Sequence, residues 1–191
     1  MTLKPSLDII IGPMFSGKST ELIRRLSIFN SLNFKVLYIN CDLDNRSEKD
    51  FSTHSHFITT LPSGIDSIKI PKNNLNLVAQ LAPDFDVFGI DEAQMFPRLY
   101  DTAMNLVESH NKKLIVSGLN GDFSRKEFGE ILQLIPLCDD ITKLHPYCVE
   151  CRKKGQLEHA IFSKRKSNCN DQILIGADSE YIPVCRKCYH S

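Results

Sequence analysis

The stretch that most constrains how this chain folds is residues 12–20, Gly-Pro-Met-Phe-Ser-Gly-Lys-Ser-Thr. An apolar run at residues 7–11, typical of a buried strand, precedes it, and residues 21–26 follow it with apolar side chains at helical spacing. A glycine-rich turn between a strand and a helix is the setting of a phosphate-binding loop, and the spacing Gly-x4-Gly-Lys-Ser fits that motif without a gap. The alternative, a glycine-containing turn that binds nothing, does not account for this placement.

The residue types of this loop suit phosphate binding. Gly12 and Gly17 permit backbone angles and a close approach that a side chain would block. Successive N–H groups can then form an anion-binding concavity, and the start of the next helix adds its free N–H groups and positive dipole end. The motif places Lys18 on the β- and γ-phosphates and the Ser19 hydroxyl on Mg²⁺. The residues assigned to phosphate binding are Gly12, Pro13, Met14, Phe15, Ser16, Gly17, Lys18, Ser19 and Thr20.

Strands and helices alternate through residue 135. Further strands are predicted from apolar runs at 35–40, 85–92 and 113–117. Helices are predicted at 75–81, 99–108 and 127–134, and a hairpin or an edge strand within 56–70. This alternation predicts an α/β fold, with a mostly parallel sheet of the P-loop NTPase type flanked by helices on both faces.

Charged residues follow two of these strands. Asp91 and Glu92 end the run at 85–92, where an Asp can hold Mg²⁺ and the adjacent Glu can orient or deprotonate a nucleophile. Two acids there could instead decorate a helix N-terminus, but the phosphate-binding loop favours the functional interpretation. Asp44 and Arg46 lie on a polar stretch after the second strand, at the sheet edge where α/β proteins bind ligands. The residues alone slightly favour a solvated loop for these two.

Four cysteines near the C-terminus form two Cys-x2-Cys pairs, and the composition shifts at about residue 144. Thiolates at this spacing can close a tetrahedral structural Zn²⁺ site, in preference to four free thiols. The predicted ligands are Cys148, Cys151, Cys185 and Cys188, with His145, His159 and His190 as nearby substitutes. Cys41, Cys138 and Cys169 are interpreted as ordinary buried or loop residues.

Two domains are expected, a nucleotide-binding domain at 1–144 and a zinc ribbon at 145–191. Residues 173–176 are expected to form a strand in the ribbon, with 182–184 as its possible partner.

The charge balance argues against a nucleic-acid partner. The 191 residues include 23 Lys plus Arg and 23 Asp plus Glu, so the chain lacks the basic excess typical of nucleic-acid binders. Its start has no apolar run of signal-peptide length, and no stretch has the length of a membrane span. A soluble, cytoplasmic protein is expected.

The ordered set of motifs resembles the thymidine kinases shared by vertebrate cytosol, many bacteria and poxviruses. The resemblance spans nearly the whole chain. It is carried by residues 12–22, Asp44-Asn45-Arg46, Thr53-His54, Asp91-Glu92-Ala93-Gln94, residues 118–126, both cysteine pairs, and Ile175-Gly176 ahead of Tyr181. It implies ATP- and magnesium-dependent phosphorylation of thymidine, and of deoxyuridine as a second substrate, for nucleotide salvage. It also implies a structural zinc, a homotetramer and feedback inhibition by dTTP, with neither nucleic acid nor membrane as a partner.

The resemblance also assigns roles to residues. Glu92 is implied as the general base for the nucleoside 5′-hydroxyl and Asp91 as the acid of the metal-water shell. Asp44 and Arg46 become active-site charged residues, which reverses the solvated-loop interpretation. Phe123 is implied beside the thymine ring, and residues 172–176 with Tyr181 match a lasso-like loop that covers the base. The implied substrate-binding set is Met14, Met95, Leu119, Phe123, Phe128, Gln172, Ile173, Leu174, Ile175, Gly176 and Tyr181.

The chain departs from the family pattern at two places. Met95 stands where many relatives have Phe, and residues 176–180 read Gly-Ala-Asp-Ser-Glu where many have Gly-Gly-Ala-Asp or Gly-Gly-Asn-Asp. These differences concern pocket shape and therefore tolerance of nucleoside analogues.

Two rival functions are weaker. A P-loop ATPase that grips nucleic acid with its zinc ribbon conflicts with the zero net charge and the lack of a second motor domain. A zinc-ribbon interaction protein with a degenerate nucleotide site conflicts with the intact Lys18, Ser19, Asp91 and Glu92.

Overall fold

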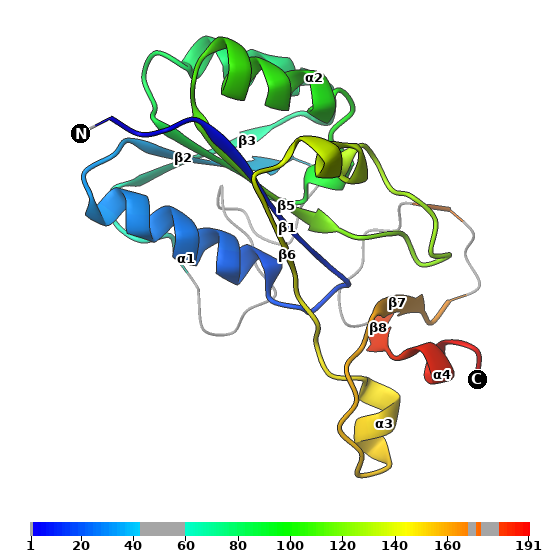
Figure 1. Cartoon of the computed structure of the whole chain (residues 1–191). Helices are drawn as coiled ribbons and strands as arrows, with labels where there is room; N and C mark the ends of the chain where they lie inside the picture. Colours follow the sequence, from blue (N-terminus) through cyan, green and yellow to red (C-terminus); the bar gives the residue numbers. More distant parts are fainter. Residues whose placement is uncertain (1, 43–59, 168–170, 173–179) are drawn as a thin grey trace.

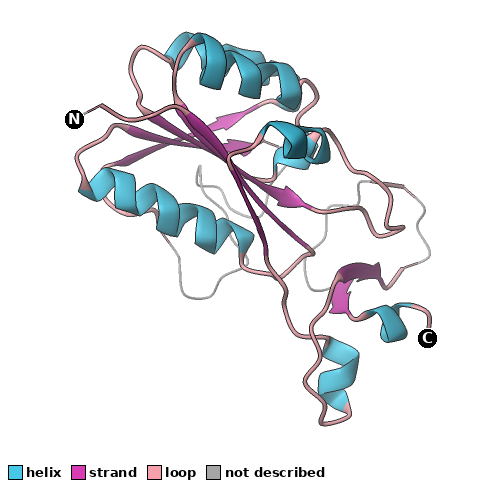
Figure 2. Ribbon diagram, in the orientation of Figure 1, coloured by secondary structure: helices cyan, strands magenta, loops and turns pink. Residues whose placement is uncertain are grey.

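A six-stranded sheet forms the centre of the molecule in the computed structural model, which describes residues 2–42, 60–167, 171–172 and 180–191. The strand order is β3-β2-β4-β5-β1-β6, and every neighbouring pair is parallel. The strands are β1 (Ser6–Gly12), β2 (Val36–Cys41), β3 (Ile65–Ile70), β4 (Val87–Ile90), β5 (Lys113–Leu119) and β6 (Asp140–Lys143). The predicted α/β fold with a mostly parallel sheet is confirmed (Figure 2).

Side chains alternate between the two faces of this sheet, as strand geometry requires. On β1, Leu7 and Ile9 join one buried cluster, whereas Ile10 joins the cluster under the first helix. The central strands are nearly fully buried because helices cover both faces, and this explains why they read as continuous apolar runs.

Helices lie on both sides of the sheet, with α1 and α2 on opposite faces (Figure 1). The helix α1 (Lys18–Ser31) buries Leu22, Ile23 and Leu26 on one face. The other face is covered by η1 (Lys72–Leu81), α2 (Leu99–Met104), the π-helical η3 (Asn105–Ser109) and η4 (Ile131–Leu137), with the short η2 (Ala93–Met95) after β4. In the part of the chain that the structure describes, no helix is long and apolar enough to cross a membrane.

A small C-terminal unit lies beyond the end of β6 (Figure 1). It consists of α3 (Val149–Lys153), β7 (Phe162–Arg165), β8 (Tyr181–Val184) and α4 (Arg186–Tyr189). The strands β7 and β8 pair antiparallel, and the buried cluster beside them consists of Cys148, Cys151, Ala160, Val184 and Cys188.

The structure differs from the sequence-based expectations at several elements. The helix expected over 127–134 is wrong in its first half, because Gly129 has φ 63 and turns the chain ahead of η4. Residues 56–70 contain an edge strand, β3, rather than a hairpin among the described residues. The edge strand β6 was not predicted, since it carries mostly exposed polar side chains. The strand β8 pairs with β7, not with 173–176, and these last residues lie outside the described ranges.

Candidate active site

The loop after β1 has the backbone of a phosphate-binding loop. Gly17 adopts the left-handed conformation (φ 84, ψ 20) as the N-cap of α1, a conformation that favours glycine. A Cβ on Gly12 would lie 2.5 Å from the Leu144 carbonyl oxygen and 2.6 Å from Ser16 Oγ, so a side chain does not fit there. Lys18 is buried, and its Nζ donates to the Pro13 carbonyl at 2.9 Å, across the loop.

Ser16 marks a place where this loop suits a polar ligand. Its Oγ is buried and finds no hydrogen-bond partner among the described residues. A buried hydroxyl without a partner is costly, and a phosphate oxygen in the loop would accept its hydrogen. Together with the ammonium group of Lys18 and the start of α1, this donor set fits an anionic phosphate chain.

Asp91 lies directly after β4 and is held by hydroxyls from three other elements. Tyr38 Oη and Ser117 Oγ each donate to its carboxylate at 2.8 Å, and Ser19 of α1 is a third hydroxyl partner. These side chains meet because alternation on β2, β4 and β5 places all three strand residues on the α1 side of the sheet. The phosphate-binding loop and the acid after β4 are therefore joined directly through Ser19.

Burial has the largest effect on Asp91, which is 1 % exposed. It raises the pKa of that carboxyl, and the neighbouring Glu92 adds to the rise, while the hydrogen bonds from Ser19, Ser117 and Tyr38 oppose it. The Glu92 backbone N–H also donates to Asp91 Oδ1 at 3.0 Å. A buried carboxylate surrounded by donors beside a serine of the phosphate-binding loop fits a magnesium position, since hard oxygen ligands suit that ion.

Glu92 adopts an unusual backbone conformation, with φ 48 and ψ 40 in the left-handed region. Residues other than glycine in this region store strain, and they cluster at active sites. The Glu92 carboxylate accepts a hydrogen bond of 2.6 Å from Gln94 Nε2. The turn therefore directs the Asp91 and Glu92 side chains to different partners, although the two residues are adjacent.

Gln94 fixes Glu92 to the end of β5. Its side chain is 4 % exposed, and its Oε1 accepts from the Leu119 backbone N–H at 3.0 Å. Two glycines also pack closely against it: a Cβ on Gly118 would lie 2.7 Å from Gln94 Oε1, and one on Gly129 would lie 2.3 Å from the Gln94 carbonyl oxygen. Gln94 is thus locked by backbone on both sides and holds the Glu92 carboxylate in one place.

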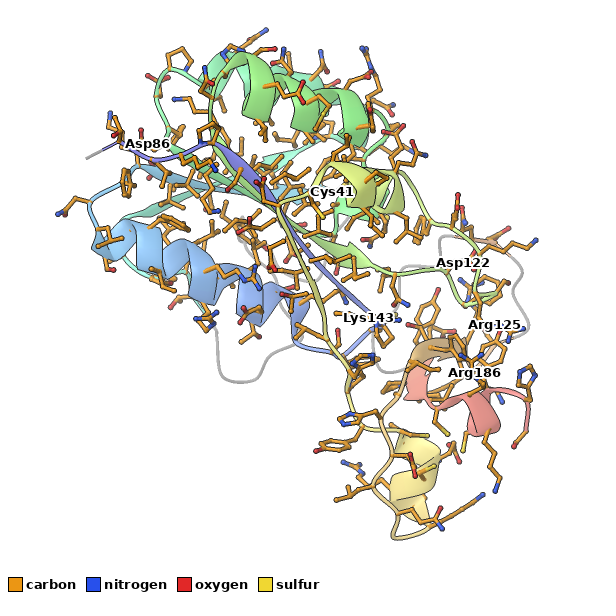
Figure 3. The ribbon with its side chains drawn as sticks, in the orientation of Figure 1. Cys41, Asp86, Asp122, Arg125, Lys143 and Arg186 are labelled. Carbon is orange, nitrogen blue, oxygen red and sulfur yellow. The ribbon has the colours of Figure 1, made fainter. Side chains whose placement is uncertain are left out.

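The C-terminal unit contacts the phosphate-binding loop and the loop after β5. Ser163 Oγ on β7 accepts from the Met14 backbone N–H at 2.9 Å. Tyr189 Oη donates to the Phe123 carbonyl at 2.7 Å, and Gln172 Nε2 donates to Asp122 Oδ2 at 2.9 Å. Figure 3 shows Arg125, from the same loop, beside the ribbon that carries Arg186, and its Cζ is 4.4 Å from the centroid of the Tyr189 ring. These contacts bring the residues expected to surround the base next to the phosphate-binding loop.

The expected substrate-binding residues that the structure describes fall into three groups. Phe123, Gln172 and Tyr181 are brought together around the guanidinium of Arg165. Met14 and Leu119 are tied to Ser163 and Gln94 through their backbone N–H groups, as described above. Met95 packs against the core under α2, and Phe128 is buried in the loop before η4. Asp44, Arg46, Ile173, Leu174, Ile175 and Gly176 lie outside the described residues.

The four predicted zinc ligands form one cluster. The sulfur atoms of Cys148, Cys151, Cys185 and Cys188 lie within 4.8 Å of one another, a spacing that fits four thiolates around a single ion. Burial opposes ionisation of Cys148, but hydrogen bonds from the backbone of Cys185 and Cys151 lower the pKa of that thiol to about 7. His159 instead contacts the rings of His145 and Tyr147.

Comparison with known proteins identifies the family. The family model described as "Thymidine kinase" matches residues 5–189. The chain belongs to the thymidine kinase family. It is 37 % identical over 183 residues to the thymidine kinase of Myxoma virus (strain Uriarra), covering 96 % of this chain and 95 % of the viral one. It is 38 % identical over 183 residues to the cytosolic thymidine kinase of Homo sapiens, covering 96 % of this chain and 72 % of the human one. The thymidine kinase of Vaccinia virus (strain Western Reserve) is also 38 % identical over 183 residues, with 96 % of each chain covered.

Several residues that shape this candidate site were not singled out from the sequence. Tyr38 and Ser117 read as ordinary members of apolar strands, yet both hold Asp91. Gln94 belongs to the motif Asp91-Glu92-Ala93-Gln94, but no role was predicted for it. Ser163 and Arg165 lie on β7, a strand that was not predicted. The one available signal was polarity inside buried strands, since a buried polar side chain requires a partner.

Proposed function

We propose that this chain transfers the γ-phosphoryl group of ATP to the 5′-hydroxyl of thymidine, giving dTMP and ADP, with deoxyuridine as a second substrate. The family supports the reaction class. The observation that carries the proposal is the position of the Glu92 carboxylate, which Gln94 holds through a hydrogen bond. Glu92 directly follows Asp91, and Asp91 contacts Ser19 of the phosphate-binding loop. That arrangement sets a proton acceptor beside a triphosphate site.

In this proposal the loop positions the triphosphate. The backbone N–H groups of residues 15–20, the ammonium group of Lys18 and the hydroxyl of Ser16 meet the phosphate oxygens. Ser19 and Asp91 would hold magnesium, which supplies neutralisation of the phosphate charge. A fixed set of donors lowers the barrier because it need not reorganise as charge develops.

Glu92 acts on the nucleoside. Its carboxylate accepts the proton of the 5′-hydroxyl as the bond from that oxygen to the γ-phosphorus forms and the bond from phosphorus to the bridging oxygen of ADP breaks. Asp91 is less suited to this task because it is buried against Ser19 of the phosphate-binding loop, where it would instead hold magnesium. Phe123 and Tyr181 supply aromatic surface for the base, next to Gln172.

The remaining assignments are part of the same proposal. Residues 1–144 form the nucleotide-binding domain and residues 145–191 a zinc ribbon whose four cysteines hold a structural Zn²⁺. Such an ion closes a tetrahedral site and stabilises a unit too small to fold on its own core. The enzyme acts in the cytoplasm as a homotetramer and is inhibited by dTTP. Asp44 and Arg46 are assigned to the active site on the family resemblance alone.

The test is a phosphate-transfer assay with γ-labelled ATP and each natural deoxynucleoside. We expect label in dTMP and dUMP, with deoxyadenosine and deoxyguanosine unlabelled. ATP hydrolysis stimulated by DNA and not by thymidine would overturn the proposal in favour of a nucleic-acid ATPase.

A further inference from the structure

Arg165 is a buried arginine on β7, at 8 % exposure. Burying a guanidinium is costly unless its charge and its N–H groups find partners, so its surroundings must be arranged for it. In the pairing of β7 with β8, Arg165 stands opposite Tyr181. It therefore lies where the C-terminal unit meets the residues proposed to surround the thymine base.

The N–H groups of Arg165 reach two separate segments. Its Nη1 donates to the Asp171 carbonyl at 2.6 Å, and its Nη2 reaches the Gln172 carbonyl at 3.4 Å. Its Nε donates to the Tyr181 hydroxyl oxygen at 3.2 Å, and its Nη2 donates to the same oxygen. One planar group thus binds the backbone at 171–172 and the side chain of Tyr181.

The face of the same guanidinium lies on aromatic rings. Its Cζ is 3.7 Å from the centroid of the Phe123 ring and 5.1 Å from that of Tyr181. Stacking of this kind combines cation–π attraction with contact of two flat surfaces, and it fixes the plane of the ring. Phe123 comes from the loop after β5, a third segment, which Tyr189 Oη also fixes through its carbonyl.

We infer that Arg165 is a positioning residue for the nucleoside base. It orders Phe123, Gln172 and Tyr181 before the nucleoside binds, so that the nucleoside does not have to order them. It acts through these three residues and has no role at the phosphates. This inference rests on the proposed thymidine kinase function. Lysine cannot take the role, because an ammonium group lacks both the forked donors and the flat face. Pre-ordering reduces the entropy lost on binding and therefore acts on affinity for thymidine.

The experiment compares Arg165→Lys with Arg186→Lys. Arg186 is a matched control: it is exposed on α4, and its Cζ also lies over an aromatic ring, that of Phe162 at 5.2 Å. We expect Arg165→Lys to raise the thymidine KM about tenfold, the weight of a lost charged hydrogen bond, with kcat and the ATP KM changed less than about threefold. Arg186→Lys should leave all three constants unchanged.

A double-mutant cycle separates positioning from general support of the fold. If Arg165 acts through the Tyr181 hydroxyl, Tyr181→Phe should weaken thymidine binding alone but add little in the Arg165→Lys background. Equal rises in the thymidine and ATP KM values, fully multiplicative effects, or an Arg165→Lys protein that does not fold would each overturn the inference. Wild-type protein that transfers no phosphate to thymidine would instead refute the proposed function.

Discussion

Two adjacent acids, Asp91 and Glu92, have different surroundings, and these support the different roles proposed for them. Asp91 is buried and accepts from the hydroxyls of Tyr38 and Ser117, whereas Glu92 turns away through a left-handed backbone conformation to meet Gln94. The sequence predicted both acids as functional, because they end an apolar run in a chain with a phosphate-binding loop. It could not predict which partners each acid contacts, since no residue type near Glu92 indicates the left-handed backbone conformation there.

Replacing each acid should give different kinetics. Glu92→Gln should keep ATP and thymidine binding but lose roughly 10²–10⁴-fold in kcat, the usual contribution of a positioned general base. Asp91→Asn should lower the rate and also raise the magnesium concentration needed for half-maximal activity, because the residue is proposed to act through the metal. Titration calorimetry and steady-state kinetics on both variants check this. Glu92→Gln turning over within a few-fold of wild type would exclude Glu92 as the base.

Gln94 should matter for both stability and rate. Gln94→Leu leaves the buried Leu119 N–H without its acceptor and releases the Glu92 carboxylate, so we expect a loss of about 1–3 kcal/mol in unfolding free energy. We also expect kcat to fall by at least about tenfold, because a misplaced base is a poor one. Urea denaturation and kinetics measure the two effects. The control is Gln133→Leu, at an exposed position on η4, which should change neither quantity. A Gln94→Leu protein with unaltered stability and kcat would contradict the role of Gln94.

At the scale of whole elements, prediction from sequence worked where burial is uniform and failed where edges are polar. The strands β1, β2, β4 and β5 were recognised because helices on both faces make them continuously apolar. The edge strand β6 was missed because its exposed side chains carry no apolar period. It is held beside β1 by the parallel pairing of residues 140–143 with residues 8–11. Arg25 of α1 adds hydrogen bonds to Asp140 at 3.1 Å and to Thr142 Oγ1 at 2.7 Å.

Glu21 connects the first turn of α1 to this edge and should do so in a pH-dependent way. The hydrogen bond from Arg24 has the largest effect on its pKa and lowers it. Burial opposes this effect and the hydrogen bond from Arg25 adds to it, so that the pKa of Glu21 falls from 4.5 to about 2. A lowered pKa means that the stabilisation is fully present above pH 4.5 and disappears as the pH falls towards 2.

Glu21→Gln should therefore reduce the unfolding free energy by up to about 1 kcal/mol at neutral pH and by progressively less below pH 4.5. Urea denaturation at a series of pH values measures the difference. The matched control is Glu108→Gln, at an exposed position on η3. A difference between wild type and Glu21→Gln that stays constant down to pH 3 would contradict the prediction.

At the scale of the whole molecule, contacts between distant segments were beyond prediction. Met14 and Ser163 are 149 positions apart, and neither residue type predicts the hydrogen bond between them. The cysteine pairs are the exception, because the spacing of two Cys-x2-Cys pairs is enough to predict a long-range cluster from the sequence. The sequence therefore predicted both the sheet and the cysteine cluster but not how they join to form the candidate site.

Assembly is a separate prediction at this scale. The family resemblance implies a homotetramer, and exposed apolar side chains such as Ile28, Leu32 and Tyr100 provide surface that association would bury. Light scattering on active protein should give about four times the chain mass of 21.7 kDa. An active monomer across the concentration range would refute the tetramer.

The cysteine cluster should control thymidine binding through the strands beside it. Among the residues that the structure describes, the buried core of the C-terminal unit consists of Cys148, Cys151, Ala160, Val184 and Cys188, so burial gives β7 and β8 little stability. The proposed structural zinc would supply the missing stabilisation, and Arg165 and Tyr181 on these strands would then hold the proposed base site. Elemental analysis should find about one zinc per chain.

Cys185→Ser should consequently raise the thymidine KM by at least about tenfold while the ATP KM changes less, since Lys18, Ser19 and Asp91 belong to the parallel sheet and α1. The control is Cys138→Ser, the same chemical change at a half-buried thiol outside the cluster, which should leave both KM values as they are. Active protein free of zinc would end the structural-zinc assignment. Equal rises in both KM values would show instead that the C-terminal unit supports the phosphate-binding loop as strongly as the base site, which is the effect expected if the Met14–Ser163 hydrogen bond dominates the junction.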